Sequence, residues 1–219
     1  MMTTTSSTII KMTKAAAQAI AGSLTETSKM PCKSYSLPTA LCVTGSKLAK
    51  VEGSICSNCY ANKGFYKVYA KGIQKAQNFR AASIYGPEWV GAMVGLIGKD
   101  TYFRWHDSGD LQSMQHLEKI VEVCLLTPWC DHWLPSRERG MVKAFIRKGG
   151  IIPVNLIIRM SAVMFDQVVP DSIPGTFTST AHKVGPAIGK ACNATKEAGC
   201  GPCRDCWDKS IPNVSYKAH

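Results

Sequence analysis

The chain has 219 residues, of which 45% are apolar and ten are cysteines, and 26 Lys and Arg against 15 Asp and Glu give a formal charge of +11. A chain of this size and apolar content can build its own core, which argues against the disulfide framework of a small secreted domain. Lys11 and Lys14 interrupt the N-terminal apolar stretch, and no apolar run approaches about 20 residues. We therefore expect a cytoplasmic protein without a signal peptide or a membrane partner.

The N-terminal composition differs from that of the rest of the chain. Residues 1–30 are rich in Thr, Ser and Ala, and they predict a flexible arm with a short helix around residues 9–21. Residues 31–219 are expected to form a single α/β domain.

Two predicted helices come first, and short buried strands then alternate with helices from residue 101 onward. Helical spacing and end signals predict helices over 66–83, 87–98, 111–125 and 138–148. Apolar and β-branched runs predict strands over 101–105, 132–134, 154–159 and 175–180. Such alternation favours a parallel sheet with right-handed crossovers. Because the units are too few for a closed eight-stranded barrel, we predict an open or partial (β/α) barrel-like parallel sheet, with helices outside and a cysteine-rich C-terminal segment.

The C-terminal cysteines have the spacing of an iron–sulfur site. Cys200, Cys203 and Cys206 are separated by two-residue steps, which bacterial ferredoxins use to hold [4Fe–4S], and Cys192 lies just upstream. The glycines and the proline between them allow tight turns with amides facing sulfur. We predict a [4Fe–4S] cluster on these four cysteines. Zinc is the alternative, because four thiolates also satisfy its tetrahedral geometry.

A second ligand group is expected from Cys42, Cys56 and Cys59. Three thiolates would leave one iron of a [4Fe–4S] cluster open to a small molecule or to water. Alternatively, Cys56 or Cys59 shares one cluster with the C-terminal cysteines, so the spacing allows one cluster or two. The other cysteines are interpreted as structural: Cys32, Cys124 and Cys130.

Four segments together resemble a known family. They are Cys56-Ser-Asn-Cys-Tyr-Ala, Phe103-Arg-Trp-His-Asp-Ser-Gly-Asp110, Trp133-Leu-Pro-Ser-Arg137 and Cys200-Gly-Pro-Cys-Arg-Asp-Cys-Trp207. The chain resembles, over about residues 30–207, a family of small bacteriophage gene products that is regarded as iron–sulfur and distantly radical-SAM-like. The resemblance implies a phage protein that works in a bacterial cytoplasm. The cluster loop departs from the Cys-x3-Cys-x2-Cys of true radical SAM enzymes, since Cys42 precedes Cys56 by fourteen positions.

Polar residues at predicted strand ends are candidates for a cofactor site. α/β folds gather functional loops at the carboxyl edge of the sheet. Ser108-Gly109-Asp110 is the nearest equivalent of the SAM-binding segment of radical SAM enzymes, and guanidinium groups suit an anionic ligand or a cluster. The alternatives are helix caps and structural ion pairs. The candidates are His106, Ser108, Gly109, Asp110, Arg137 and Arg159.

These observations predict a [4Fe–4S]-binding redox protein that serves electron transfer or redox sensing, with host redox proteins or a reductant as partners. One alternative is a radical-SAM-like enzyme, in which an open cluster iron binds SAM near Ser108 to Asp110. Another is a zinc-stabilised module that binds nucleic acid, suggested by the charge of +11, although the basic residues are scattered. Phosphate-binding loops and nucleophile elbows are absent from the sequence, which disfavours common hydrolase chemistry.

Overall fold

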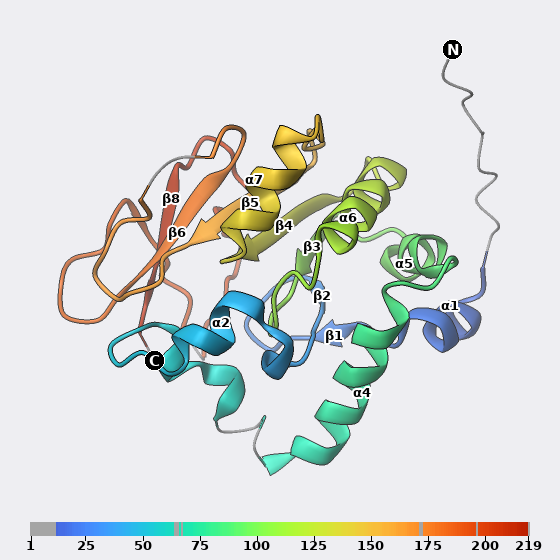
Figure 1. Cartoon of the computed structure of the whole chain (residues 1–219), viewed down its shortest axis with the longest axis horizontal. Coiled ribbons are helices and arrows are strands. Elements are labelled where there is room, and N and C mark those ends of the chain that lie inside the picture. Colours follow the sequence, from blue (N-terminus) through green and yellow to red (C-terminus); the bar gives the residue numbers. More distant parts are fainter. Residues whose placement is uncertain (1–11, 64–65, 67, 171–172, 196, 219) are drawn as a thin grey trace.

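A computed structural model describes residues 12–63, 66, 68–170, 173–195 and 197–218 (Figure 1). Its eight strands form one open sheet in the order β1-β2-β3-β4-β5-β6-β8-β7. β1 pairs with β2 in antiparallel fashion, and every other neighbouring pair is parallel. The predicted open α/β fold is therefore confirmed.

The strands are β1 (Thr25–Glu26), β2 (Lys33–Tyr35), β3 (Tyr102–Trp105), β4 (Asp131–Ser136), β5 (Leu156–Ser161), β6 (Phe177–His182), β7 (Lys190–Ala191) and β8 (Asn213–Lys217). The α-helices are α1 (Lys14–Ala21), α2 (Val43–Leu48), α4 (Ala70–Ser83), α5 (Trp89–Ile97), α6 (Met114–Leu126) and α7 (Arg139–Arg147). Three 3₁₀ turns are η1 (Thr39–Leu41), η2 (Cys56–Asn58) and η3 (Tyr60–Asn62). Among the helices of the described residues, none combines the length and apolar character needed to cross a membrane.

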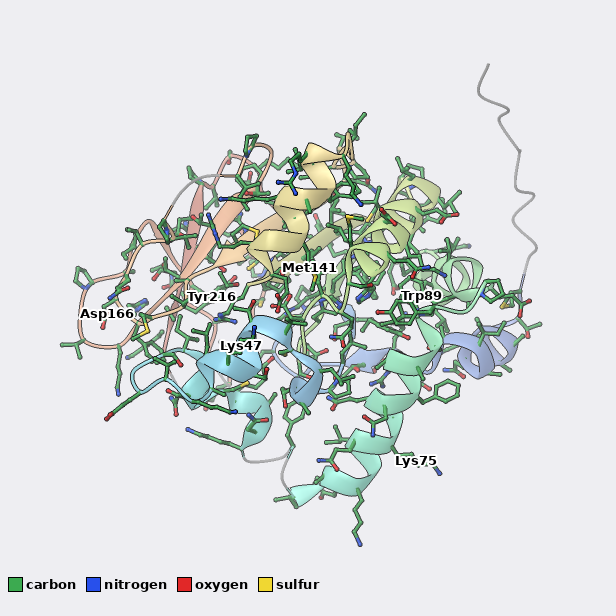
Figure 2. All side chains as sticks on the ribbon, viewed as in Figure 1. Lys47, Lys75, Trp89, Met141, Asp166 and Tyr216 are labelled. Carbon is green, nitrogen blue, oxygen red and sulfur yellow. The ribbon has the colours of Figure 1, made fainter. Side chains whose placement is uncertain are left out.

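One face of the sheet packs against α5, α6 and α7 (Figure 1). Successive strand residues point to opposite faces, so Phe103 and Trp105 both enter this helix-covered core and are fully buried. Trp89 of α5, labelled in Figure 2, lies with its ring 6.1 Å from that of Trp105. Cys124 and Cys130 are fully buried in the same core, as the sequence predicted.

The opposite face, here called the second face, carries Arg104, Trp133 and Arg159, which alternate with core residues along β3, β4 and β5. A smaller apolar cluster covers it, formed by Trp133 and Ile157 with Trp207 of the C-terminal segment. The cysteine-rich segment therefore lies against the sheet on the side away from α5–α7.

The described part of the predicted N-terminal arm, residues 12–30, is built into the fold. α1 packs on α5, and its Ala17 and Ala21 are fully buried because small side chains allow close approach. The Tyr35 hydroxyl donates a hydrogen bond to the Ala21 carbonyl over 2.7 Å. β1 then adds an antiparallel strand to the sheet. Residues 9–11 of the predicted helix lie outside the described residues.

Gly109 occupies a backbone position that demands glycine. Its φ is +81°, and a Cβ there would lie 2.5 Å from the Leu37 Cβ. We expect Gly109→Ala to lower the free energy of unfolding by roughly 2–4 kcal/mol, from left-handed strain and overpacking. Gly91→Ala in α5 is the matched control, because a Cβ there meets nothing within 4 Å; it should stabilise by about 0.5–1 kcal/mol. Urea unfolding measures both, and equal stabilities of the two variants would contradict this assignment.

Buried histidines should make stability depend on pH. Burial lowers the pKa values of His116 and His132 from 6.5 to about 3. As the pH falls below about 6.5, these histidines bind protons in the unfolded chain but not in the folded chain, so the free energy of unfolding falls. Each histidine should cost roughly 2 kcal/mol between pH 7 and pH 5. Urea unfolding of His132→Asn at both pH values should show a loss smaller by about that amount; an unchanged loss would show that His132 does not drive it.

Candidate functional site

Loops from three parallel strands meet at one edge of the sheet. The loop after β2 carries the three cysteines Cys42, Cys56 and Cys59, here called the edge group. The loop after β3 carries residues 106–110, and the loop after β4 begins with Arg137. Parallel strands place their carboxyl ends together, which is where open α/β sheets bind ligands.

Two of the three edge-group cysteines, Cys42 and Cys56, lie beside Gly45 of α2. The sulfur atoms of Cys42 and Cys56 both lie 3.6 Å from the point that a Cβ on Gly45 would occupy. Burial raises the pKa of Cys42 to about 12. The negative charges that Asp110, Cys59 and Cys56 carry when they are ionised raise it further. The prediction that Cys42 lies with Cys56 and Cys59 therefore agrees with the fold.

Hydrogen bonds anchor this loop on the sheet. Both carboxylate oxygens of Glu138 accept hydrogen bonds of 2.7 Å from Thr44, one from its backbone N–H and one from its hydroxyl. The Ile55 amide donates to the Val163 carbonyl over 2.9 Å. These contacts hold both halves of the loop against the ends of β4 and β5. Sequence reasoning missed Thr44 and Glu138, which are 94 positions apart in the chain.

Asp110 is a structural centre of the edge. Its carboxylate accepts hydrogen bonds from the Ser136 hydroxyl at 2.6 Å and from the backbone amides of Arg137 and Leu111 at 2.8 and 2.7 Å. Burial raises the pKa of Asp110 to about 6, against the effect of these hydrogen bonds. Its charge also acts on Cys42 and Cys56, so the predicted site residue does lie beside the edge group.

The other residues after β3 have different surroundings. The Ser108 hydroxyl donates to the Leu37 carbonyl over 2.8 Å and accepts a hydrogen bond from Gln77, which indicates a loop-holding role. His106 is 2% exposed, has a φ of +59° and lies 5.1 Å, ring to ring, from His116 of α6. His106 therefore contacts the helix-covered core rather than the edge group. Asp107 accepts hydrogen bonds from Ser34 and Tyr66.

Four cysteines form a second set, here called the C-terminal group: Cys192, Cys200, Cys203 and Cys206. The Cys192 amide donates to the Ser215 carbonyl of β8 over 2.8 Å, and the Cys200 amide donates to the Lys29 carbonyl over 2.8 Å. Cys192 acts electrostatically on each of the other three thiols. Burial raises the pKa of Cys206 to about 11, whereas Cys203 is exposed.

Aromatic side chains cover one side of the C-terminal group. The Trp207 ring lies 5.4 Å from both Tyr102 and Trp133, and its Nε1 donates to the Phe103 carbonyl over 3.1 Å. Tyr216, labelled on β8 in Figure 2, stacks on Trp133, and its hydroxyl lies 3.3 Å from the Cys206 sulfur. This arrangement keeps water away from the Cys206 side of the group.

Arg159 holds the C-terminal segment in place. It is fully buried in β5, and its Nε donates to the Cys206 carbonyl over 3.0 Å. Its remaining acceptors are the carbonyls of Thr178, Asp205, Asp208 and Ile211, at 2.9–3.2 Å. A guanidinium has five N–H groups, and each has an acceptor here. These hydrogen bonds give Arg159 a structural role, and its contact with a ligand stays a prediction.

Arg137 keeps its predicted place at a strand end. Its Nε donates to the Ala162 carbonyl over 3.1 Å, which links the ends of β4 and β5. Its positive charge opposes the rise that burial causes in the pKa of Cys56. Arg137 can therefore stabilise negative charge on the edge group.

The chemistry of these donors suits an iron–sulfur cluster. Thiolates are the ligands of such clusters, and aromatic cover and nearby N–H donors tune them. As the side chains stand, no three or more His, Cys, Asp or Glu of the described residues are arranged to hold a metal ion. The Nε of Arg104 is nevertheless buried without a hydrogen-bond partner among the described residues, and its charge acts on Cys200 and Cys206. A negatively charged cluster on the C-terminal group would meet this cation.

Comparison with known proteins gives one match. The model of the family described as Gene product 88 matches residues 5–209. No curated protein and no solved structure matches the chain.

Proposed function

Since the chain belongs to the Gene product 88 family, whose description names no reaction, we propose from the site itself that it is a [4Fe–4S]-binding redox protein for electron transfer or redox sensing. The observation that carries the proposal is the C-terminal group. Two contacts support it: the Cys192 amide donates to the Ser215 carbonyl of β8, and the hydroxyl of the next residue, Tyr216, lies 3.3 Å from the Cys206 sulfur. A bound [4Fe–4S] cluster supplies one-electron transfer.

The protein would tune this chemistry through its own residues. Trp133, Trp207 and Tyr216 exclude water from one side of the C-terminal group, and the Tyr216 hydroxyl can donate to sulfur at Cys206. Arg159 fixes the path of the segment that carries Cys206. Burial and hydrogen bonding to sulfur are the means by which proteins set cluster potentials. A host redox protein or reductant in a bacterial cytoplasm would be the electron partner.

Iron and acid-labile sulfide, counted per chain after anaerobic reconstitution, test the proposal. One cluster predicts about four irons with about four sulfides, and two clusters predict about eight of each. Zinc without sulfide would replace the proposal with a zinc-stabilised protein. In that case, salt-sensitive binding of DNA or RNA would favour a nucleic-acid-binding module.

The edge group favours a second candidate function, a radical-SAM-like enzyme. Cys42, Cys56 and Cys59 follow the first parallel strand and lie with Asp110 at the carboxyl edge of an open sheet. Three thiolates leave one iron of a cluster without a protein ligand. Reduction in the presence of SAM should then release 5′-deoxyadenosine, and the Cys56→Ser variant should release none. A wild-type protein that contains iron but makes no 5′-deoxyadenosine would retain the electron-transfer assignment alone.

A further inference from the structure

Arg104 lies on the second face of the sheet, in the middle of β3. In the strand register it is paired with Ser34 of β2 on one side and with Trp133 of β4 on the other. Its guanidinium carbon lies 4.5 Å from the centroid of the Trp133 ring. Stacking on a tryptophan that itself packs against Trp207 fixes the guanidinium beneath the cysteine-rich segment.

Arg104 is partly buried, and one of its N–H groups has no acceptor in the part of the chain that the structure describes. Its side chain shares a hydrogen bond with Tyr60, and one terminal nitrogen lies 3.0 Å from the Met30 sulfur, which is a weak acceptor. Its Nε is buried and has no partner among the described residues. Arg159, two strands away on the same face, instead donates to five carbonyls. A buried N–H of a cation is costly unless an acceptor meets it.

The surroundings of Arg104 indicate where such an anion would lie. Trp133, on which Arg104 stacks, itself stacks on Tyr216, and the Tyr216 hydroxyl lies 3.3 Å from the Cys206 sulfur. The aromatic cluster that Arg104 stacks upon also includes Cys206. The carboxylate nearest to Arg104 along the chain is that of Asp107, which already accepts hydrogen bonds from Ser34 and Tyr66. The C-terminal group is therefore the place where negative charge would meet Arg104.

Resting on the proposed cluster, we propose that Arg104 is a positioning residue for the C-terminal group, with its positive charge and unused Nε–H directed at a negatively charged cluster. Its electrostatic effect is to favour the reduced state, which carries one more negative charge, and so to raise the reduction potential.

Redox titration of reconstituted Arg104→Gln, followed by EPR, tests this inference. The variant should keep the wild-type iron and sulfide content. At a fixed applied potential, its ratio of reduced to oxidised cluster should fall about tenfold, which is about 59 mV for a one-electron couple. Arg104→Lys should recover part of the difference, because it restores the charge without the guanidinium geometry. Arg147→Gln, the same change of charge in the last turn of α7, should match the wild type.

The outcomes separate this inference from the proposed function. A wild-type protein without iron and sulfide overturns the proposed function, and the inference with it. A wild-type protein with a cluster whose potential is unchanged in Arg104→Gln overturns the inference alone. Circular dichroism can show that Arg104→Gln is folded although it takes up no iron. In that case, iron uptake by Arg104→Lys supports the inference that the cluster needs a cation at this position. Failure of both folded variants, with uptake by Arg147→Gln, assigns Arg104 a purely structural role.

Discussion

Cys192→Ser is expected to remove the cluster of the C-terminal group. The Cys192 amide donates to the Ser215 carbonyl, next to Tyr216, whose hydroxyl lies 3.3 Å from the Cys206 sulfur, so we assign Cys192 as the fourth ligand. A serine hydroxyl is a poor substitute for a thiolate ligand. Iron per chain should fall from about four to near zero if there is one cluster, and from about eight to about four if the edge group holds another.

The matched control for Cys192→Ser is Cys130→Ala, which removes a thiol from the helix-covered core and not from the C-terminal group. It should leave the iron and sulfide content at the wild-type value, even if it lowers stability. Full iron content in Cys192→Ser, measured beside this control, would remove Cys192 from the ligand set and leave a cluster shared with the edge group as the remaining arrangement.

Arg159→Met should cause the largest loss of stability among single substitutions outside the cysteines. Methionine fills similar space but leaves five carbonyls without their donor, among them those of Cys206, Asp205 and Asp208. Breaking such a buried network costs about 3–5 kcal/mol, or roughly 10 °C in the melting temperature of a chain of this length. The C-terminal segment should lose its path across the sheet, so iron uptake should fall as well.

Arg147→Met provides the comparison for Arg159→Met, because it makes the same chemical change in the last turn of α7. Its melting temperature should stay within about 2 °C of the wild type. If Arg159→Met melts no lower than Arg147→Met, the five hydrogen bonds do not hold the C-terminal segment, and its position must come from Trp207 and its neighbours.

The repeated helices and strands were predictable because their signals are local. Gly98 ends α5 with a φ of +56°, as its place in the sequence predicted, and β3 lies within the predicted strand. α6 begins at Met114 rather than residue 111, because the Ser113 hydroxyl caps it by accepting the His116 amide at 3.1 Å. β2 and β8 were missed, since three-residue and largely polar strands lack a distinct pattern.

The cysteine groups were predictable from spacing, but the residues that position them were not. The Thr44–Glu138 contact joins segments that only the sheet topology brings together. Arg159 was predicted to contact a ligand near a strand end. Four of its five carbonyl partners come instead from the loop between β7 and β8, whose path the sequence does not encode locally. The role of Arg104 had one sign in the sequence, its position between Phe103 and Trp105. A charged residue inside a buried strand needs a partner.

The most direct test of the central claim is the EPR spectrum of the anaerobically reconstituted and reduced full chain. The proposed function predicts a [4Fe–4S]⁺ signal whose spin count matches the iron content, and which Cys192→Ser weakens or abolishes. A colourless sample with no such signal, and with all ten thiols free or oxidised to disulfides, would contradict it.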